Sequence, residues 1–138
     1  MAGFRLISDT TGSPMVIRKY KVTNSEAISR GEALKFVSGR LTKASVADTP
    51  AAIATHAVTA GTDKECEVII ITANQVYEVA YEGTKDASFI VGLATAELDT
   101  DGMALNAADA TPAGAVSILK IDDTTKLCQV MFAKRQLN

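Results

Sequence analysis

The sequence contains no tryptophan, one histidine and two cysteines among its 138 residues, and aromatic residues make up only 5% of it. Valine, isoleucine, leucine and alanine must therefore fill most of the core, which favours thin sheets that pack closely. A chain of this length buries roughly two thirds of its unfolded surface, so it can form one core without disulfides or structural metals. We expect a single self-sufficient domain.

Long apolar runs are also missing. The longest strongly apolar run is Val68 to Ile71, and the first twelve residues contain neither a basic region nor an apolar one. A secretion signal and a membrane span both need such segments. We therefore expect neither of them, and no membrane as a partner.

The residues that usually carry chemistry are few and isolated. Cys66 and Cys128 lie in apolar, strand-like segments without CxxC spacing, so we expect buried reduced thiols, with a disulfide between them as the alternative. His56 stands alone in an Ala-rich stretch, which rules out a His-rich metal site. No recognisable nucleophile elbow accompanies it. These observations argue against a catalytic or metal-binding role.

Two acidic patterns need separate interpretations. Asp99-Thr100-Asp101-Gly102 resembles the middle of a calcium loop, but the twelfth position of that loop would be Ala108 instead of a bidentate glutamate. A polar turn is the better interpretation. Glu78 and Glu82 alternate with apolar residues and read as one solvated face of a strand.

Nucleotide-binding and nucleic-acid-binding signatures are absent as well. The sequence has no GxGxxG or GxxxxGK[ST] motif, and its net charge is −2. Lys126 does not lie in the setting of a biotinyl or lipoyl carrier lysine. We predict a protein that is not an enzyme, uses no cofactor or metal, and does not bind nucleic acid.

The small net charge conceals an uneven distribution. Residues 1–43 carry eight basic and three acidic residues (+5), whereas residues 44–138 carry six basic and thirteen acidic residues (−7). This asymmetry could steer the chain to an acidic neighbour, or bring the basic part of one copy to the acidic part of another. A solvated surface with unevenly placed charges is the alternative interpretation.

Residues 1–14 have little periodicity and end in a Thr-Gly-Ser-Pro turn, so we predict an extended N-terminal arm, followed by a single β-rich domain over residues 15–138. The arm contains the apolar residues Phe4, Leu6 and Ile7, which are unfavourable in a tail that stays in solvent. We expect them to dock on this chain, on a sister copy or on a partner.

Period-two alternation predicts several strands and hairpins in the domain. Residues 15–23 form a strand whose wet face carries Lys19 and Lys21. Residues 32–37 and 40–44 form a hairpin across Ser38-Gly39, with Phe36 opposite Leu41. Residues 48–58 are ambiguous between helix and strand, and their β-branched residues favour a strand.

The second half of the chain continues the pattern. Residues 65–72 and 75–82 read as the clearest hairpin, with Tyr77, Val79 and Tyr81 on its apolar face. Residues 88–94 read as a strand, and residues 103–112 as irregular or a helical turn. Residues 115–121 and 127–133 form a last hairpin. We predict an all-β fold, a small barrel or sandwich of about seven to nine short strands.

From Ile28 onward, turns and strand edges follow one another in this order: Ile28-x-x-Gly31-Glu-Ala-Leu34, Ser38-Gly39-Arg-Leu41, an Ala-rich strand with Gly61, Phe89-Ile-Val-Gly92, Asp101-Gly102-Met-Ala-Leu105-Asn106, Gly114-Ala-Val-Ser-Ile118 and Val130-Met-Phe132. This order resembles the head decoration, or capsid cement, proteins of tailed phages.

This resemblance implies a non-enzymatic virion protein, made in the host cytoplasm, that forms a homotrimer on the capsid exterior. It would bind the major capsid protein at local threefold positions and stabilise the shell. Several members of the family have an N-terminal segment that orders against the capsid, as the arm here could. The residues expected at the capsid or subunit interface are Phe4, Arg5, Leu6, Ile7, Arg18, Lys19 and Lys21.

Two other function classes stay open. A tail-tube or baseplate module is also a small β-barrel that assembles, but into rings of different symmetry. A small enzyme or carrier subunit would need a bound cofactor or a deep polar pocket around His56. Mass in solution separates the first alternative from a threefold protein, and purified protein with a bound cofactor would support the second.

Overall fold

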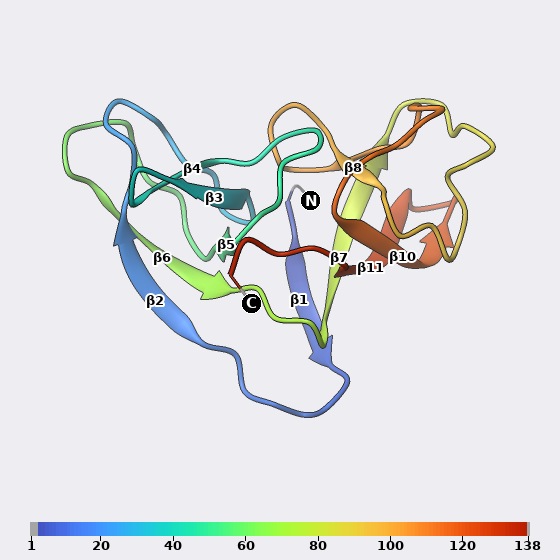
Figure 1. Ribbon diagram of the computed structural model, residues 1–138, viewed down its shortest axis with the longest axis horizontal. Coiled ribbons are helices and arrows are strands. Elements are labelled where there is room, and N and C mark those ends of the chain that lie inside the picture. Colours follow the sequence, from blue (N-terminus) through green and yellow to red (C-terminus); the bar gives the residue numbers. More distant parts are fainter. Residues whose placement is uncertain (1–2, 138) are drawn as a thin grey trace.

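The computed structural model describes residues 3–137, which form eleven strands in two curled sheets and contain no helix (Figure 1). The six-stranded sheet comprises β1 (Arg5–Asp9), β7 (Gln75–Glu82), β8 (Glu97–Leu98), β9 (Leu105–Asn106), β10 (Val116–Asp122) and β11 (Leu127–Phe132). The five-stranded sheet comprises β2 (Ile17–Lys21), β3 (Ala33–Val37), β4 (Arg40–Lys43), β5 (Ala52–Ala54) and β6 (Glu65–Ile70). The expected small all-β fold is confirmed. It has more strands than predicted because the predicted arm contributes β1 and because the two-residue strands β8 and β9 lie outside the predicted strands.

The order in the first sheet is β10-β11-β7-β9-β8, with β1 also paired to β7, and the order in the second is β2-β6-β5-β3-β4. In the part of the chain that the structure describes, no helix is long and apolar enough to cross a membrane.

Two predicted hairpins are confirmed. Ser38 and Gly39, with φ of 51° and 79°, connect β3 to β4, and Phe36 lies opposite Leu41. Positive φ at both central residues is the requirement of a tight hairpin turn that follows the twist of the strands. The β10–β11 hairpin also forms, with a register shift between Ile118 and Lys120.

The hairpin predicted from residues 65–72 and 75–82 is wrong, because β6 and β7 belong to different sheets. β6 pairs with β2 and β5, whereas β7 pairs with β1, β11 and β9. Gln75, buried at the crossover, accepts hydrogen bonds from the Thr72 amide at 2.9 Å and the Tyr77 hydroxyl at 2.8 Å, and its amide nitrogen donates to the Ile70 carbonyl at 3.3 Å. The two strands are therefore linked by a crossover between sheets. The faces predicted for β7 are correct, since Tyr77, Val79 and Tyr81 are buried.

Residues 88–94 do not form the predicted strand. They form successive turns in which only Phe89 is buried, while Ile90 and Val91 are exposed. The apolar run has the composition of a strand, but its backbone bonds to β10 are those of a loop, from Gly92 to Ile118 and from Ile118 to Leu93. The strand favoured within residues 48–58 is confirmed as β5. The region 103–112 is irregular apart from β9.

The buried side chains form two clusters. The larger lies between the sheets and against the six-stranded one, and five of its members are aromatic: Phe4, Tyr77, Tyr81, Phe89 and Phe132. The smaller lies on the five-stranded sheet and consists of aliphatic residues and Cys66, with Tyr20 and Phe36 packed at its edge. The backbone approaches closely beside Ala44 of the larger cluster: a Cβ added at Gly102, whose φ is +69°, would lie 2.5 Å from the Ala44 carbonyl oxygen.

Candidate interaction surface

The first strand docks on its own chain. β1 runs antiparallel to β7, and the Phe4 ring is buried with its centroid 5.2 Å from that of Phe132 and 6.2 Å from that of Tyr77. This is the first of the three docking sites that the sequence left open. Phe4 was expected at a partner contact, but here it fills the aromatic cluster. A large aromatic ring stabilises the fold more when it is buried than when it stays in water.

The rest of the predicted arm is a strand followed by a loop. Residues 1 and 2 lie outside the described part of the chain. Arg5 is exposed and donates to the Glu78 carboxylate at 2.7 Å, while Leu6 and Ile7 are half-buried. Among the described strands, β1 has only β7 as a partner. Its other edge faces the space between the two sheets and has no strand bonded to it.

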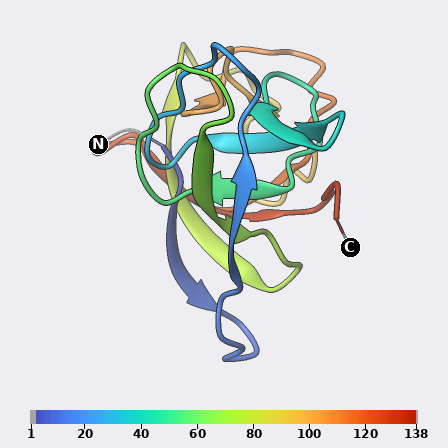
Figure 2. The same cartoon turned by 90° about the vertical axis from the view of Figure 1, so that its left-hand side faces the viewer.

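The loop from Thr10 to Val16 projects from the body of the molecule (Figures 1 and 2). Every residue from 10 to 19 is exposed, including the apolar Met15, Val16 and Ile17 at 50%, 38% and 40%. Asp9 holds the start of the loop, since its carboxylate accepts from the Thr11 hydroxyl and amide. These bonds lower the pKa of Asp9 below its ordinary value. An exposed run of three apolar residues on a held loop is typical of a protein-binding surface.

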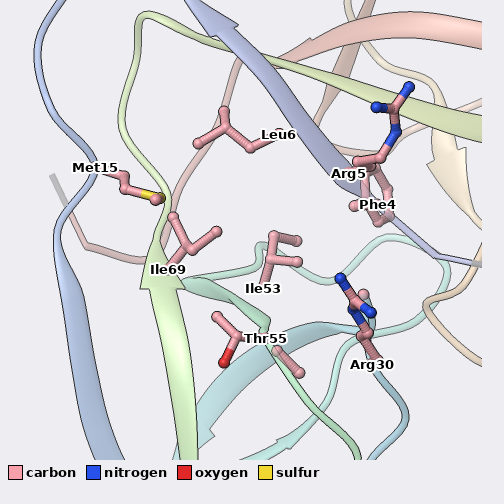
Figure 3. Close-up of a pocket in the computed structure, with 10 residues that line it drawn as sticks. Phe4, Arg5, Leu6, Met15, Arg30, Ile53, Thr55 and Ile69 are labelled. Carbon is pink, nitrogen blue, oxygen red and sulfur yellow. The ribbon is translucent and has the colours of Figure 1, made fainter.

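A cleft of about 550 Å³ lies between β1 and the five-stranded sheet (Figure 3). Its walls are mostly apolar, and two arginines lie on the same side of it. The residues that line it are Phe4, Arg5, Leu6, Met15, Arg30, Gly31, Ile53, Ala54, Thr55 and Ile69. A smaller hollow of about 290 Å³ is lined by residues of β1 and of the loop after it, and it shares Leu6 and Met15 with the cleft.

The two arginines of the cleft differ in their surroundings. Arg5 points its guanidinium away from the cleft, toward Glu78, whereas Arg30 points its guanidinium into the space beside Ile53 (Figure 3). Among the described residues, no acidic side chain forms an ion pair with Arg30. Arg30 therefore offers a free positive charge at the mouth of an apolar cleft, which is a suitable arrangement for an amphipathic partner with a carboxylate.

The positive charges of β2, the basic strand predicted as an interface, are partly balanced by acidic residues of the same chain. In β2, Lys19 and Lys21 lie opposite Glu67 and Glu65 of β6. Lys21 also lies 3.8 Å from Asp63. Arg18 donates only to the neighbouring Ile17 carbonyl. The structure places all three on an exposed edge strand that follows the projecting loop, and none of them lines the cleft.

The cysteines, the histidine and the acidic turn, which were the candidates for a chemical role, are buried or hydrogen-bonded within the chain. Cys66 and Cys128 are buried free thiols, as predicted, and burial raises the pKa of Cys66 to about 11 and that of Cys128 to about 12. The exposed His56 accepts the Glu67 amide proton at its Nε2. Asp101 accepts the Met103 amide proton in the turn that was compared with a calcium loop.

A second apolar surface, which the sequence pattern does not indicate, lies at the other end of the molecule. Ile90 and Val91 are 59% and 58% exposed on the turns that replace the predicted strand, and Leu119 is exposed beside the register shift of β10. No sequence signal separates such a turn from a buried strand, because both are short apolar runs flanked by small residues.

No protein-family model matches the chain, and no curated protein matches its sequence.

Proposed function

We propose that this chain is a non-enzymatic virion structural protein that binds the outside of a phage capsid at local threefold positions and stabilises the shell. The observation that carries the proposal is the projecting loop, because it presents Met15, Val16 and Ile17 to solvent next to the basic strand β2. The resemblance of the turn order to capsid cement proteins supplies the identity of the partner, the major capsid protein. The capsid exterior is the proposed location.

The geometry supports binding in two ways. The exposed apolar residues Met15, Val16 and Ile17 can pack against an apolar capsid surface, and the neighbouring basic strand β2 can meet acidic capsid residues. Three copies in one homotrimer would present three such loops, and linked binding events multiply weak contacts into a firm attachment. A protein of this kind opposes shell expansion mechanically and has no active site.

A triple substitution of the loop tests the proposal. Met15→Ser, Val16→Ser and Ile17→Ser together should weaken binding to empty heads by at least about tenfold, because about 1.4 kcal/mol of contact energy corresponds to a factor of ten. Co-sedimentation of purified protein with heads that lack it measures the affinity. The fold should be unchanged, because all three side chains are exposed.

A matched control is Val37→Ser with Val46→Ser, since both side chains are similarly exposed on other parts of the chain. The control should bind as the wild type does. Equal binding by the loop variant and the wild type would contradict the proposed contact. Hexameric rings in negative-stain images would contradict the threefold assembly and favour a tail component.

A further inference from the structure

One end of the molecule carries an apolar knob, which we define as Ile90, Val91 and Leu119. Ile90 and Val91 are the most exposed of the large apolar residues described, and Leu119 is 43% exposed. The backbones that carry them lie side by side, since the Gly92 amide donates to the Ile118 carbonyl at 2.9 Å and the Ile118 amide donates to Leu93 at 2.8 Å. The knob is therefore a raised apolar turn fixed to an edge strand.

The knob lies in an acidic part of the chain. Residues 83–114 contain five acidic residues and a single basic one, Lys85, and Lys85 is paired with Asp123. Asp86 accepts the Ser88 amide at 2.9 Å at the start of the turn. This bond holds the pKa of Asp86 below its ordinary value, so Asp86 is a carboxylate at neutral pH. Ile90 and Val91 thus lie a few positions after the Asp86 carboxylate, whereas the exposed Lys120 follows Leu119.

The cleft between β1 and the five-stranded sheet has the opposite character. It is a hollow with Leu6, Ile53 and Ile69 in its walls and Arg30 at its mouth. Its volume of about 550 Å³ lies within the range of pockets that bury a sizeable ligand. An occupant that buries apolar side chains and places a carboxylate near Arg30 would match both its shape and its charge.

We infer that copies of this chain associate head to tail, with the apolar knob of one copy seated in the arginine-flanked cleft of the next. The two surfaces belong to different parts of the molecule: the knob lies with β10 at one end of the long axis, and the cleft lies between β1, β5 and β6 (Figure 1). The contact therefore joins two different surfaces, and such contacts close into rings when the rotation allows.

A closed ring of this kind would also place every projecting loop on the same face, because cyclic symmetry repeats each element at one height. That face is the one that the proposed function turns toward the shell. The inference rests on the proposed function for its purpose but not for its test, since association in solution is measured without capsids.

The experiment uses one variant for each side of the contact. Ile90→Asp with Val91→Asp removes the knob, and Arg30→Glu reverses the charge at the cleft; all three side chains are exposed, so both proteins should fold. The controls are Val37→Asp with Val46→Asp for the knob and Lys134→Glu for the cleft, which make the same chemical changes at other exposed positions. Circular dichroism checks the fold of every variant.

Analytical ultracentrifugation should show the wild type and both controls as the same closed oligomer, and each contact variant with an association constant at least about tenfold weaker. Native mass spectrometry of an equimolar mixture of the two contact variants should show mixed pairs. In such a pair, the intact cleft of the knob variant holds the intact knob of the Arg30→Glu variant, so only one contact is available and no ring closes.

Three results would overturn the inference: a wild type that stays monomeric at its highest soluble concentration, an oligomer that both contact variants leave unchanged, or a mixture that contains no mixed pairs. A monomer that still binds empty heads would refute this contact and leave the proposed function standing. A ring that fails to bind heads would refute the proposed function and leave this contact standing.

Discussion

The two core clusters achieve burial with different side chains. Five of the seven aromatic residues are buried in the cluster of the six-stranded sheet, where rings meet edge-on or tilted at centroid distances of 5.2–6.2 Å. The cluster of the five-stranded sheet is built from alanine, valine, leucine, isoleucine and Cys66. Aromatic rings therefore fill much of the first cluster, whereas aliphatic side chains and one thiol fill the second.

The difference shows where this protein is vulnerable. A cluster built on rings loses stability when a ring is removed, because a cavity follows. A cluster of closely packed aliphatic residues loses stability when volume is added, because the added atoms have no space to occupy. The following predictions test whether the two sides of the protein behave in these opposite ways.

Removing the first ring should have the largest effect. Phe4→Ala takes a buried ring from between Tyr77 and Phe132 and should lower the free energy of unfolding by about 3–5 kcal/mol. The half-buried Phe36, at the edge of the other cluster, is the matched control, and Phe36→Ala should have a clearly smaller effect. Urea unfolding curves measure both. Equal decreases in the free energy of unfolding would mean that the aromatic cluster contributes no more to stability than the edge of the other cluster.

The crossover between the sheets should come next. Gln75→Ala removes the side chain that accepts from Thr72 and Tyr77 and leaves the buried Tyr77 hydroxyl without its bond, which should lower the free energy of unfolding by about 1–3 kcal/mol. Gln129→Ala, at a half-buried site on β11, is the control. Thermal unfolding followed by circular dichroism compares them. A loss no greater than that of the control would show that the crossover does not depend on this amide.

Adding volume to the cluster of the five-stranded sheet should lower the free energy of unfolding by a similar amount. Ala52→Leu inserts a larger side chain at a fully buried site and should lower the free energy of unfolding by about 1–3 kcal/mol. Ala60→Leu makes the same change at an exposed site and should leave unfolding in urea nearly unchanged. If Ala52→Leu were stabilising, this sheet would contain spare volume and the contrast between the clusters would fail.

The smallest effect concerns a buried carboxyl on the same sheet. Glu32 is 1% exposed, accepts the Ser29 amide at 2.9 Å and lies 3.9 Å from the Lys43 ammonium. Burial raises the pKa of Glu32 above its ordinary value of 4.5 despite both partners. The folded state therefore binds this proton more tightly than the unfolded state, so stability should rise as pH falls from 7 toward 4.5.

Glu32→Gln should flatten that part of the pH profile, because the amide stays neutral throughout. Melting temperatures between pH 7 and pH 4.5 measure the slope in both proteins. Below about pH 3.8, both should lose stability, since hydrogen bonds and ion pairs lower the pKa of Asp48 and Asp63 in the folded state. An unchanged slope in the variant would show that Glu32 does not contribute to the pH dependence.

Sequence patterns predicted this fold well where local rules decide it. Ser38-Gly39 determines a tight turn, and the alternation in β7 and β11 determines which faces are buried. They failed where tertiary pairing decides. The turn at residues 73–74 is compatible with a hairpin, but pairing of β6 with β5 and of β7 with β11 sends the two strands to different sheets.

The candidate surfaces divide in the same way. The apolar character of Leu6 and Ile7 and the basic character of β2 are visible in the sequence. The cleft is not, because residues 4–6, 30–31, 53–55 and 69 meet only in the folded chain. The burial of Phe4 within its own chain was not predicted either. It depends on the pairing of β1 with β7, whose partners lie up to 73 positions apart in the sequence, as Arg5 and Glu78 do. No local pattern reports a contact so distant.

Imaging of decorated shells tests the central claim most directly. Purified protein should be added to empty heads that lack it, and the complexes examined by electron cryo-microscopy with icosahedral averaging. Extra density is expected on the outer surface at local threefold positions, with the projecting loop of residues 10–16 and the adjoining Ile17 against the capsid. Heads without added density, or density confined to tail structures, would contradict the claim.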